Sequence, residues 1–344
     1  MLEVADREAG TRLLPDTLFR LASMTKPIVA ATALALVERG RLSLDDTVAK
    51  WLPDFRPKLR DGTTPDILIR HLLTHTSGLT YGFVEQRGHA YHKANVSDGL
   101  DQPGLSMEEN LRRLGSVPLE YKPGTGWRYS VAMDVLGAVL AHVQGGKLAD
   151  AVTEYVTGPL GMSETSFRAP DAKRLAVVYA DGKPEPIRMG EPQRVPRPED
   201  PGTEIIFSPA RAFDERSFQS GGAGLNGSAA DYMTFLEAIR NEGRKILKPA
   251  TVAMASQNQI GNLPRPAGDV GLRSGFFGNI VADPKAAGVP LSPGTLTGGG
   301  AWGHKWYIDR ARNLSIVALT NTAMEGVAGD FPAALRKAIY GAIA

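Results

Sequence analysis

The chain has no cysteine in its 344 residues. This absence excludes disulfide bonds, thiol nucleophiles and cysteine-ligated metals, and it suits a reducing compartment. The chain also lacks any run of about 18 apolar residues, which a membrane-spanning helix would need. Its opening residues, MLEVADREAG, lack the basic stretch and apolar core of a secretory signal. We therefore predict a cytoplasmic protein that does not associate with membranes.

Charge of either sign is in little excess, since 39 basic and 37 acidic residues give a formal net charge of +2. A chain so close to neutral is not expected to bind nucleic acid. The G-x-S-x-G motif is also missing, which disfavours an α/β-hydrolase. The apolar content of 42% and charged content of 22% are ordinary globular values. The expected partner is therefore a small molecule.

The clearest helical pattern covers residues 22–39, which are apolar nearly all round and end at Gly40. A helix without a polar face is expected to be buried. Pro27 is tolerated only in the first turn, which places Ser23 at or beside the helix N-terminus. Apolar spacing and capping residues predict further helices at 42–53, 66–75, 106–115, 130–146, 228–241, 248–256 and 331–344.

Strand-like runs gather toward the C-terminus, at residues 274–283, 304–309 and 314–322. They are rich in β-branched and aromatic residues and are separated by turn residues. Neighbouring strands joined by short turns imply an antiparallel sheet. We therefore predict an α+β fold in which helices flank an antiparallel sheet.

Three residues form a candidate catalytic group. A serine hydroxyl is a poor nucleophile until a base removes its proton, and Lys26 lies one helical turn after Ser23, on the same face. Free lysine and free tyrosine titrate near pH 10, but a lysine cation favours the tyrosinate and burial disfavours charged lysine. Tyr129, in GTGWRYSVAMD, is the candidate partner. Alone, Ser23 could equally be an ordinary helix cap.

The oxyanion of an acylation reaction needs two backbone N–H donors. One candidate is the N–H of Ser23 at the helix N-terminus, and the other is a residue at the edge of the segment TGGGAWG.

Five segments occur in an order that resembles the serine β-lactamase-like superfamily: SMTK, HLLTHTSGL, YSV, PLGM and GGAGLNGSAADY. This superfamily includes class C β-lactamases, D-alanyl peptidases and family VIII carboxylesterases. The resemblance covers nearly the whole chain. It implies that Ser23 is the acylated nucleophile, Lys26 its proton partner and Tyr129 the general base, with no metal or cofactor.

The resemblance also implies two lobes with the active site in the cleft between them. Residues 1–65 and 225–344 would form an α/β lobe, and residues 66–224 an inserted, mainly helical lobe. Family members usually begin with a helix and a strand before the turn at which this chain starts, EVADREAG. We therefore expect the first sheet strand to be missing. The open sheet edge would favour aggregation or a homo-oligomer.

The third motif departs from the family pattern. Lactamases and peptidases carry Lys-Thr-Gly or His-Thr-Gly there, and family VIII esterases commonly carry Trp-Gly-Gly. Here Gly298-Gly299-Gly300 aligns, which has neither a cation nor an indole. Ala301 would then supply the second oxyanion N–H. Since no cation meets a β-lactam carboxylate, the chain is closest to family VIII, and a small neutral ester is the expected substrate.

The resemblance leaves alternatives open. A β-lactamase, D-aminopeptidase or acyltransferase would share the first half-reaction, and a non-catalytic relative would keep the fold to bind a ligand. The expected substrate-binding residues are Gly299, Gly300, Trp302, His304 and Phe276. His71 and His75 have the i, i+4 spacing of a zinc pair, but no third ligand accompanies them, so both are expected to be structural.

Overall fold

A five-stranded antiparallel sheet organises the C-terminal part of the chain. The computed structural model describes residues 4–197 and 200–343. The strands lie in the spatial order β13-β12-β11-β10-β9, so each pairs with its neighbour in sequence. Their bounds are β9 Leu272–Ser274, β10 Asn279–Val281, β11 Leu296–Gly300, β12 His304–Asp309 and β13 Leu314–Ala318. The predicted α+β class, with helices flanking an antiparallel sheet, is confirmed.

The run 274–283, expected to be a single strand, is a hairpin instead. The chain turns between β9 and β10, where the N–H of Gly275 donates to the carbonyl of Gly278 at 2.9 Å. Gly278 has φ 146°, which side-chain-bearing residues rarely adopt. The β-branched and aromatic composition predicted extended backbone correctly, but the two glycines mark a reversal of direction.

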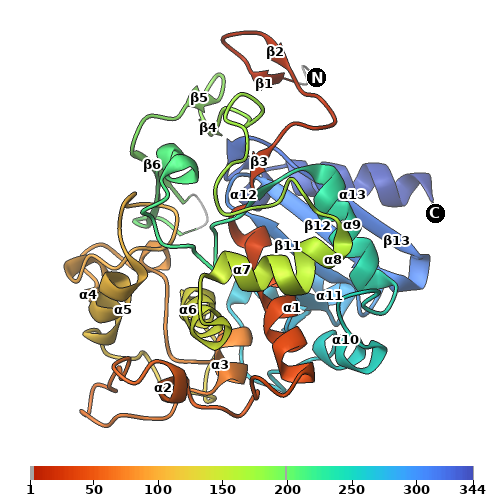
Figure 1. Cartoon of the computed structure of the whole chain (residues 1–344). Helices are drawn as coiled ribbons and strands as arrows, with labels where there is room; N and C mark the ends of the chain where they lie inside the picture. The colour runs from red at the N-terminus through yellow and green to blue at the C-terminus, as the bar shows by residue number, and fades with distance from the viewer. Residues whose placement is uncertain (1–3, 198–199, 344) are drawn as a thin grey trace.

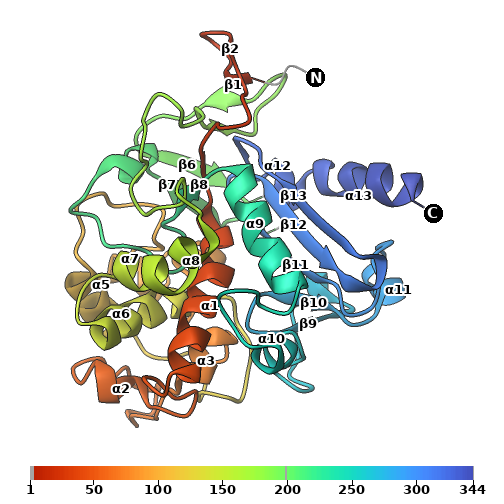
Figure 2. The ribbon, with the colours of Figure 1, turned by 45° about the vertical axis from the view of Figure 1, so that its right-hand side comes forward.

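Helices cover both faces of the sheet (Figures 1 and 2). α1 (Thr25–Glu38) and α9 (Ala229–Arg240) lie on one face, and α13 (Phe331–Ala342) lies on the other. α1 is buried along most of its length, as its uniformly apolar sequence predicts. One continuous core joins α1 to the inner face of the sheet and to α6 (Ala132–Gln144).

Most of the remaining helices of the first half gather on the side of α1 away from the sheet, whereas α8 (Gly158–Leu160) reaches α9 in front of the sheet (Figure 1). The others are α2 Val48–Trp51, α3 Ile69–Leu73, α4 Ala90–Lys93, α5 Met107–Gly115, α7 Leu148–Val152 and the π-helix η3 Thr153–Thr157. α2 contacts α6, although residues 1–65 were assigned to the other lobe. The division into two lobes stays a prediction.

Short strands and helices complete the fold. The strands are β1 Val4–Asp6, β2 Thr11–Arg12, β3 Phe19–Arg20, β4 Tyr179–Ala180, β5 Ile187–Arg188, β6 Gln193–Pro196, β7 Glu204–Phe207, β8 Asn226–Gly227 and β14 Thr322–Ala323. The helices are η1 Ala22–Met24, η2 Gly82–Val84, η4 Pro209–Phe213, η5 Ala267–Asp269, η6 Arg310–Arg312, α10 Pro249–Ala255, α11 Pro284–Ala287 and α12 Glu325–Ala328. Among the described residues, no helix is long and apolar enough to cross a bilayer.

Two pairings bear on the expectations from sequence. β3 pairs with β8, which places the glycine-rich segment before residue 226 beside the start of α1. β13 forms one edge of the main sheet and pairs, within residues 4–197 and 200–343, with β12 alone. β1 and β2 form a separate hairpin away from that edge (Figure 1). The strand that was expected to be missing from this sheet is not found in the described part of the chain.

Candidate active site

The chain enters the candidate nucleophile through a strained turn. Ala22, directly before Ser23, is fully buried and has φ 45°, an uncommon value for a residue with a side chain. The neighbouring N–H of Leu21 donates to the carbonyl of Leu225 at 2.8 Å, and Met24 N–H donates back to Leu21 O at 3.1 Å. Strained backbone conformations of this kind cluster at functional sites. The turn holds Ser23 at the beginning of the buried helix.

The structure brings Ser23, Lys26 and Tyr129 together. The Ser23 Oγ lies 2.7 Å from the Tyr129 hydroxyl, and Lys26 Nζ donates to the same Oγ at 3.0 Å. Lys26 Nζ also donates to the carbonyl of Gly222 at 2.8 Å, which fixes the lysine between α1 and the glycine-rich segment. A nucleophile, a cation and a candidate base thus share one hydrogen-bonded cluster.

The lysine also faces two aromatic rings. Its Nζ lies 4.7 Å from the centroid of the Tyr129 ring and 5.3 Å from that of Tyr81. The two rings are 5.0 Å apart, and Tyr81 is stacked on Phe83 at 4.4 Å. A cation beside a phenol stabilises the phenolate electrostatically. The arrangement therefore suits proton transfer from Ser23 to Tyr129.

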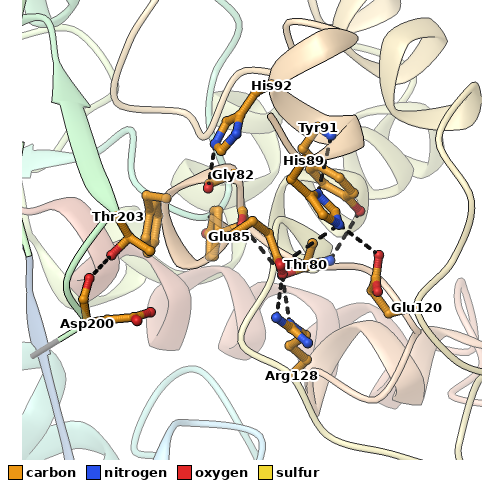
Figure 3. A network of polar contacts seen from close by, with 12 residues as sticks. Thr80, Gly82, Glu85, His89, Tyr91, His92, Glu120, Arg128, Asp200 and Thr203 are labelled. Carbon is orange, nitrogen blue, oxygen red and sulfur yellow. Dashed lines mark hydrogen bonds and ion pairs between the residues drawn. The ribbon is translucent and has the colours of Figure 1, made fainter. Parts of the chain in front are cut away.

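A network of polar contacts fixes the loop that carries Tyr129 (Figure 3). The neighbouring Arg128 pairs with Glu85 at 2.6 Å and donates to the Thr80 hydroxyl at 3.1 Å. Thr80 in turn donates to Glu85 at 2.6 Å. Glu85 is buried, whereas the Arg128 side chain is 40% exposed, so the pair joins a buried carboxylate to a guanidinium at the surface. This network joins the segment around Tyr81 to the segment around Tyr129.

His75 supports Tyr129 from another side. The two rings lie 4.9 Å apart, and His75 Nδ1 lies 3.2 Å from the Ser130 hydroxyl. Burial lowers the pKa of His75 well below its usual value, so the ring is neutral. His71 Nδ1 accepts the N–H of Leu68 at the start of α3. Each histidine thus has a structural contact, and the described residues contain no cluster of three or more potential metal ligands.

The glycine triplet lies close to the nucleophile turn. A methyl group built on Gly300 would meet the carbonyl oxygen of Leu21 at 2.5 Å, so only glycine lets β11 approach so closely. The N–H of Met324 donates to the carbonyl of Ala301 at 3.2 Å, which fixes the residue after the triplet. Ala301 as the second oxyanion donor stays a proposal, which this close approach supports.

The space beside the first glycine of the triplet is filled by a side chain from the neighbouring strand. A methyl group on Gly298 would lie 2.7 Å from Nε1 of Trp306, which is buried on the face of the sheet that packs on α1. Lys305 is the only cation of that strand. By strand alternation it lies on the opposite face of the sheet, the same face as Tyr307, beside α13. Burial and the nearby Arg336 lower the pKa of Lys305 to about 8.

His304, expected to contact substrate, is a structural residue. Its ring is fully buried; Nδ1 accepts the N–H of Thr320 at 3.0 Å and Nε2 donates to the carbonyl of Arg20 at 2.8 Å. Burial lowers its pKa to about 4. Both ring nitrogens are therefore occupied by backbone groups, and the substrate-binding assignment is corrected.

Two other expected substrate contacts are also buried. Trp302 is 3% exposed and packs against Phe207, with ring centroids 4.4 Å apart. Phe276 is 3% exposed and borders a separate hollow between α3 and residues 259–264. Gly299 and Gly300 lie on β11, next to the nucleophile turn. A role for these four residues in substrate binding stays a prediction.

Two residues of the site were missed from sequence, Tyr81 and Asp134. Both are buried, and Asp134 lies in the first turn of α6, close to Gly222. A signal for Asp134 was present, since it is the only charged residue in the apolar stretch SVAMDVLGAVLA. Charged residues are rarely buried without a partner.

Comparisons with known proteins show which family the chain belongs to. The Beta-lactamase family model matches residues 1–339. Esterase EstB of Burkholderia gladioli is 48% identical over 338 residues, which cover 98% of this chain and 86% of that protein. The solved structure of EstCE1, described as a hydrolase with promiscuous acyltransferase activity, has a TM-score of 0.92 at 40% identity and covers 98% of this chain and 88% of its own. A lovastatin esterase of Penicillium rubens is 28% identical over 359 residues, with 96% of this chain and 85% of that protein covered.

Proposed function

Because the chain belongs to the β-lactamase family, we propose that it is a serine carboxylesterase that cleaves small, uncharged esters through an acyl-enzyme. The observation that carries the proposal is the shared contact of the Ser23 Oγ with the Tyr129 hydroxyl and Lys26 Nζ. The similarity to esterase EstB over 98% of the chain supports the choice of ester as substrate.

In the acylation step, Tyr129 as phenolate accepts the proton of Ser23 while the Oγ attacks the ester carbonyl. The N–H groups of Ser23 and Ala301 stabilise the tetrahedral oxyanion. When the intermediate collapses, the C–O bond to the leaving group breaks and Tyr129 returns the proton to the departing alcohol. Lys26, which donates to Ser23, holds the Oγ beside the Tyr129 hydroxyl.

In the deacylation step, Tyr129 takes a proton from water, whose oxygen attacks the acyl carbon. The ester bond to Ser23 then breaks, the acid leaves, and Ser23 recovers its proton. The chain's own residues carry each proton, so the proposed reaction needs no metal or cofactor.

The preference for neutral esters follows from the third motif. Gly298-Gly299-Gly300 carries no cation, and Lys305 is directed to the other face of the sheet. A substrate carboxylate beside the reacting carbonyl would therefore lack a charge-assisted bond. That bond is worth about 1.5–3 kcal/mol, so a β-lactam is expected to be the poorer substrate.

Acyl transfer to an alcohol is the second candidate function. EstCE1, 40% identical in sequence, is described as a hydrolase with promiscuous acyltransferase activity. Transfer would use the same acyl-enzyme, with an alcohol in place of water. A β-lactamase, a D-aminopeptidase and a non-catalytic ligand-binding protein are disfavoured, the last because Ser23, Lys26 and Tyr129 are all in hydrogen-bonding positions. A cytoplasmic location and a homo-oligomeric state stay predictions.

A panel of p-nitrophenyl esters, with nitrocefin as the β-lactam, tests the proposal. We expect turnover of acetyl and butyryl esters, a kcat/KM for nitrocefin at least about tenfold lower, and no activity in Ser23→Ala. Added alcohol should yield a new ester if transfer competes with hydrolysis. Nitrocefin turnover equal to ester turnover would overturn the esterase assignment.

A further inference from the structure

A buried carboxylate lies behind the catalytic lysine. Asp134 is 2% exposed, and its Oδ1 accepts the Ser220 hydroxyl at 2.5 Å and the Gly222 N–H at 3.4 Å. Its other oxygen, Oδ2, is buried and has no hydrogen-bond partner among the described residues. An unpaired buried carboxylate oxygen is costly, so its retention calls for an explanation.

The unpaired oxygen lies beside Gly222, the residue whose carbonyl binds Lys26. A methyl group built on Gly222 would lie 2.7 Å from Asp134 Oδ2 and 2.7 Å from the Tyr81 hydroxyl. Both groups therefore converge above the Gly222 α-carbon. The carbonyl of this same glycine accepts the proton of Lys26 Nζ. Asp134 thus binds the N–H of Gly222, and Lys26 binds its carbonyl.

Other charged and titratable groups also face Asp134. Arg211, from η4, is the second nearby cation, but its guanidinium is held by the carbonyls of Asp101, Gln102 and Phe218. Tyr81 and Asp98, from the segment 81–98, are other titratable groups near Asp134. Burial raises the pKa of Asp134, while the Ser220 hydroxyl, Lys26 and the Gly222 N–H act in the opposite direction.

We infer that Asp134 is a positioning residue for the proposed esterase reaction, its carboxylate acting as the buried counter-ion of Lys26. It touches neither Ser23 nor the ester. A negative charge at this place favours the protonated state of the Lys26–Tyr129 pair, and it offsets the cost of burying the ammonium. The inference rests on the proposed function, because it assigns the pair its role in proton transfer.

The test is the pH profile of kcat/KM for Asp134→Asn, which keeps the shape and removes the charge. Lys26 Nζ lies 4.7 Å from the centroid of the Tyr129 ring, so loss of the nearby anion should act on both groups and move both limbs of the profile to lower pH. At an effective dielectric constant of about 20, unit charges within about 12 Å of each other shift a titration by about one pH unit or more, so we expect a shift of at least about one pH unit. When kcat/KM is expressed as a fraction of each protein's maximum, the variant should be at least about tenfold more active than the wild type at a given pH on the acidic limb. On the alkaline limb it should be at least about tenfold less active.

Asp98→Asn is the matched control. It also removes a carboxyl group beside the site, but Asp98 is half-buried and accepts the N–H groups of Gly82 and Phe83 rather than facing Gly222. Its profile should shift much less than that of Asp134→Asn. Equal shifts in both variants, or unchanged limbs in Asp134→Asn, would overturn the inference.

A measurement on the unaltered protein covers the case in which Asp134→Asn does not fold. The assigned carboxyl carbon of Asp134, followed by NMR, should show an ionised group at the pH of maximal activity. A neutral carboxyl there would overturn the counter-ion role. Activity that survives Ser23→Ala would instead reject the proposed function, so the two failures are distinguishable.

Discussion

The hydroxyl of Tyr129 lies 2.7 Å from the Oγ of Ser23, although 106 positions separate them in sequence. The contact depends on two supports that differ in chemistry. The Arg128–Glu85 pair fixes the loop before α6, and His75 packs against the Tyr129 ring. A phenol held at this distance accepts the serine proton without a further rearrangement, and this geometry is the basis of the proposed esterase activity.

Removal of the Tyr129 hydroxyl should slow the chemistry without abolishing binding. We expect Tyr129→Phe to lower kcat by about 10²–10⁴, the usual contribution of a general base, with a much smaller change in KM. Initial rates on a butyryl ester measure both constants. If most of kcat remained, the base would be another group.

Replacement of Lys26 should be at least as damaging. Lys26→Ala removes the donor to Ser23 and the cation beside the Tyr129 ring, so we expect a loss in kcat of about 10²–10⁴ or more. Lys305→Ala is the matched control, because this lysine lies on the face of the sheet toward α13. Comparable losses in the two variants would show that the assigned role of Lys26 is wrong.

Gly298 is predicted to tolerate no side chain. The indole of Trp306 occupies the place of a β-carbon, so Gly298→Ala should lower the free energy of unfolding by about 1–3 kcal/mol through overpacking. Gly268→Ala is the control, since a methyl group there meets nothing within 4 Å and its φ is not positive. Denaturant unfolding of both variants gives the comparison. Equal stability of the two would contradict the crowding at Gly298.

We expect the protein to lose stability in acid, because His304 is buried in its neutral form. Its pKa is about 4 in the folded protein against an ordinary value of 6.5, so the unfolded chain binds more protons between these pH values. Stability is therefore complete above about pH 6.5 and falls as the pH drops toward 4, by about 3 kcal/mol from this residue.

Unfolding free energies measured from pH 4 to pH 6.5 test this contribution. His304→Gln should give a flatter profile than the wild type, because glutamine has no proton to take up. His75, whose pKa is also lowered by burial, leaves part of the slope in both proteins. Parallel profiles would contradict the buried neutral state of His304.

Local patterns predicted the parts of the site that lie within one element. The apolar run 22–39 is found as η1 and α1, and the i, i+3 spacing of Ser23 and Lys26 places both side chains on one face. Ser106, the first residue of the predicted helix 106–115, caps α5 and accepts the N–H of Glu109 at 3.2 Å. Such features depend on neighbours in sequence and are therefore readable from it.

Contacts between distant segments were predicted less well. The prediction that His304 contacts substrate is wrong, because both of its ring nitrogens bind backbone groups of Arg20 and Thr320. The indole beside Gly298 comes from Trp306 on the next strand, which only the register of β11 and β12 determines. Tyr129 was predicted from the chemistry that Ser23 and Lys26 require and from a motif that resembles a family, whereas Asp134 and Tyr81 carried no comparable motif.

The most direct test is to trap the acyl-enzyme and locate the modified residue. A p-nitrophenyl butyrate reaction quenched in acid, followed by peptide mass spectrometry, should show one butyryl group on the peptide that contains Ser23. Tyr129→Phe should also carry less of it, because the variant acylates more slowly. Ester turnover with the acyl group on another residue, or undiminished turnover in Ser23→Ala, would contradict the account.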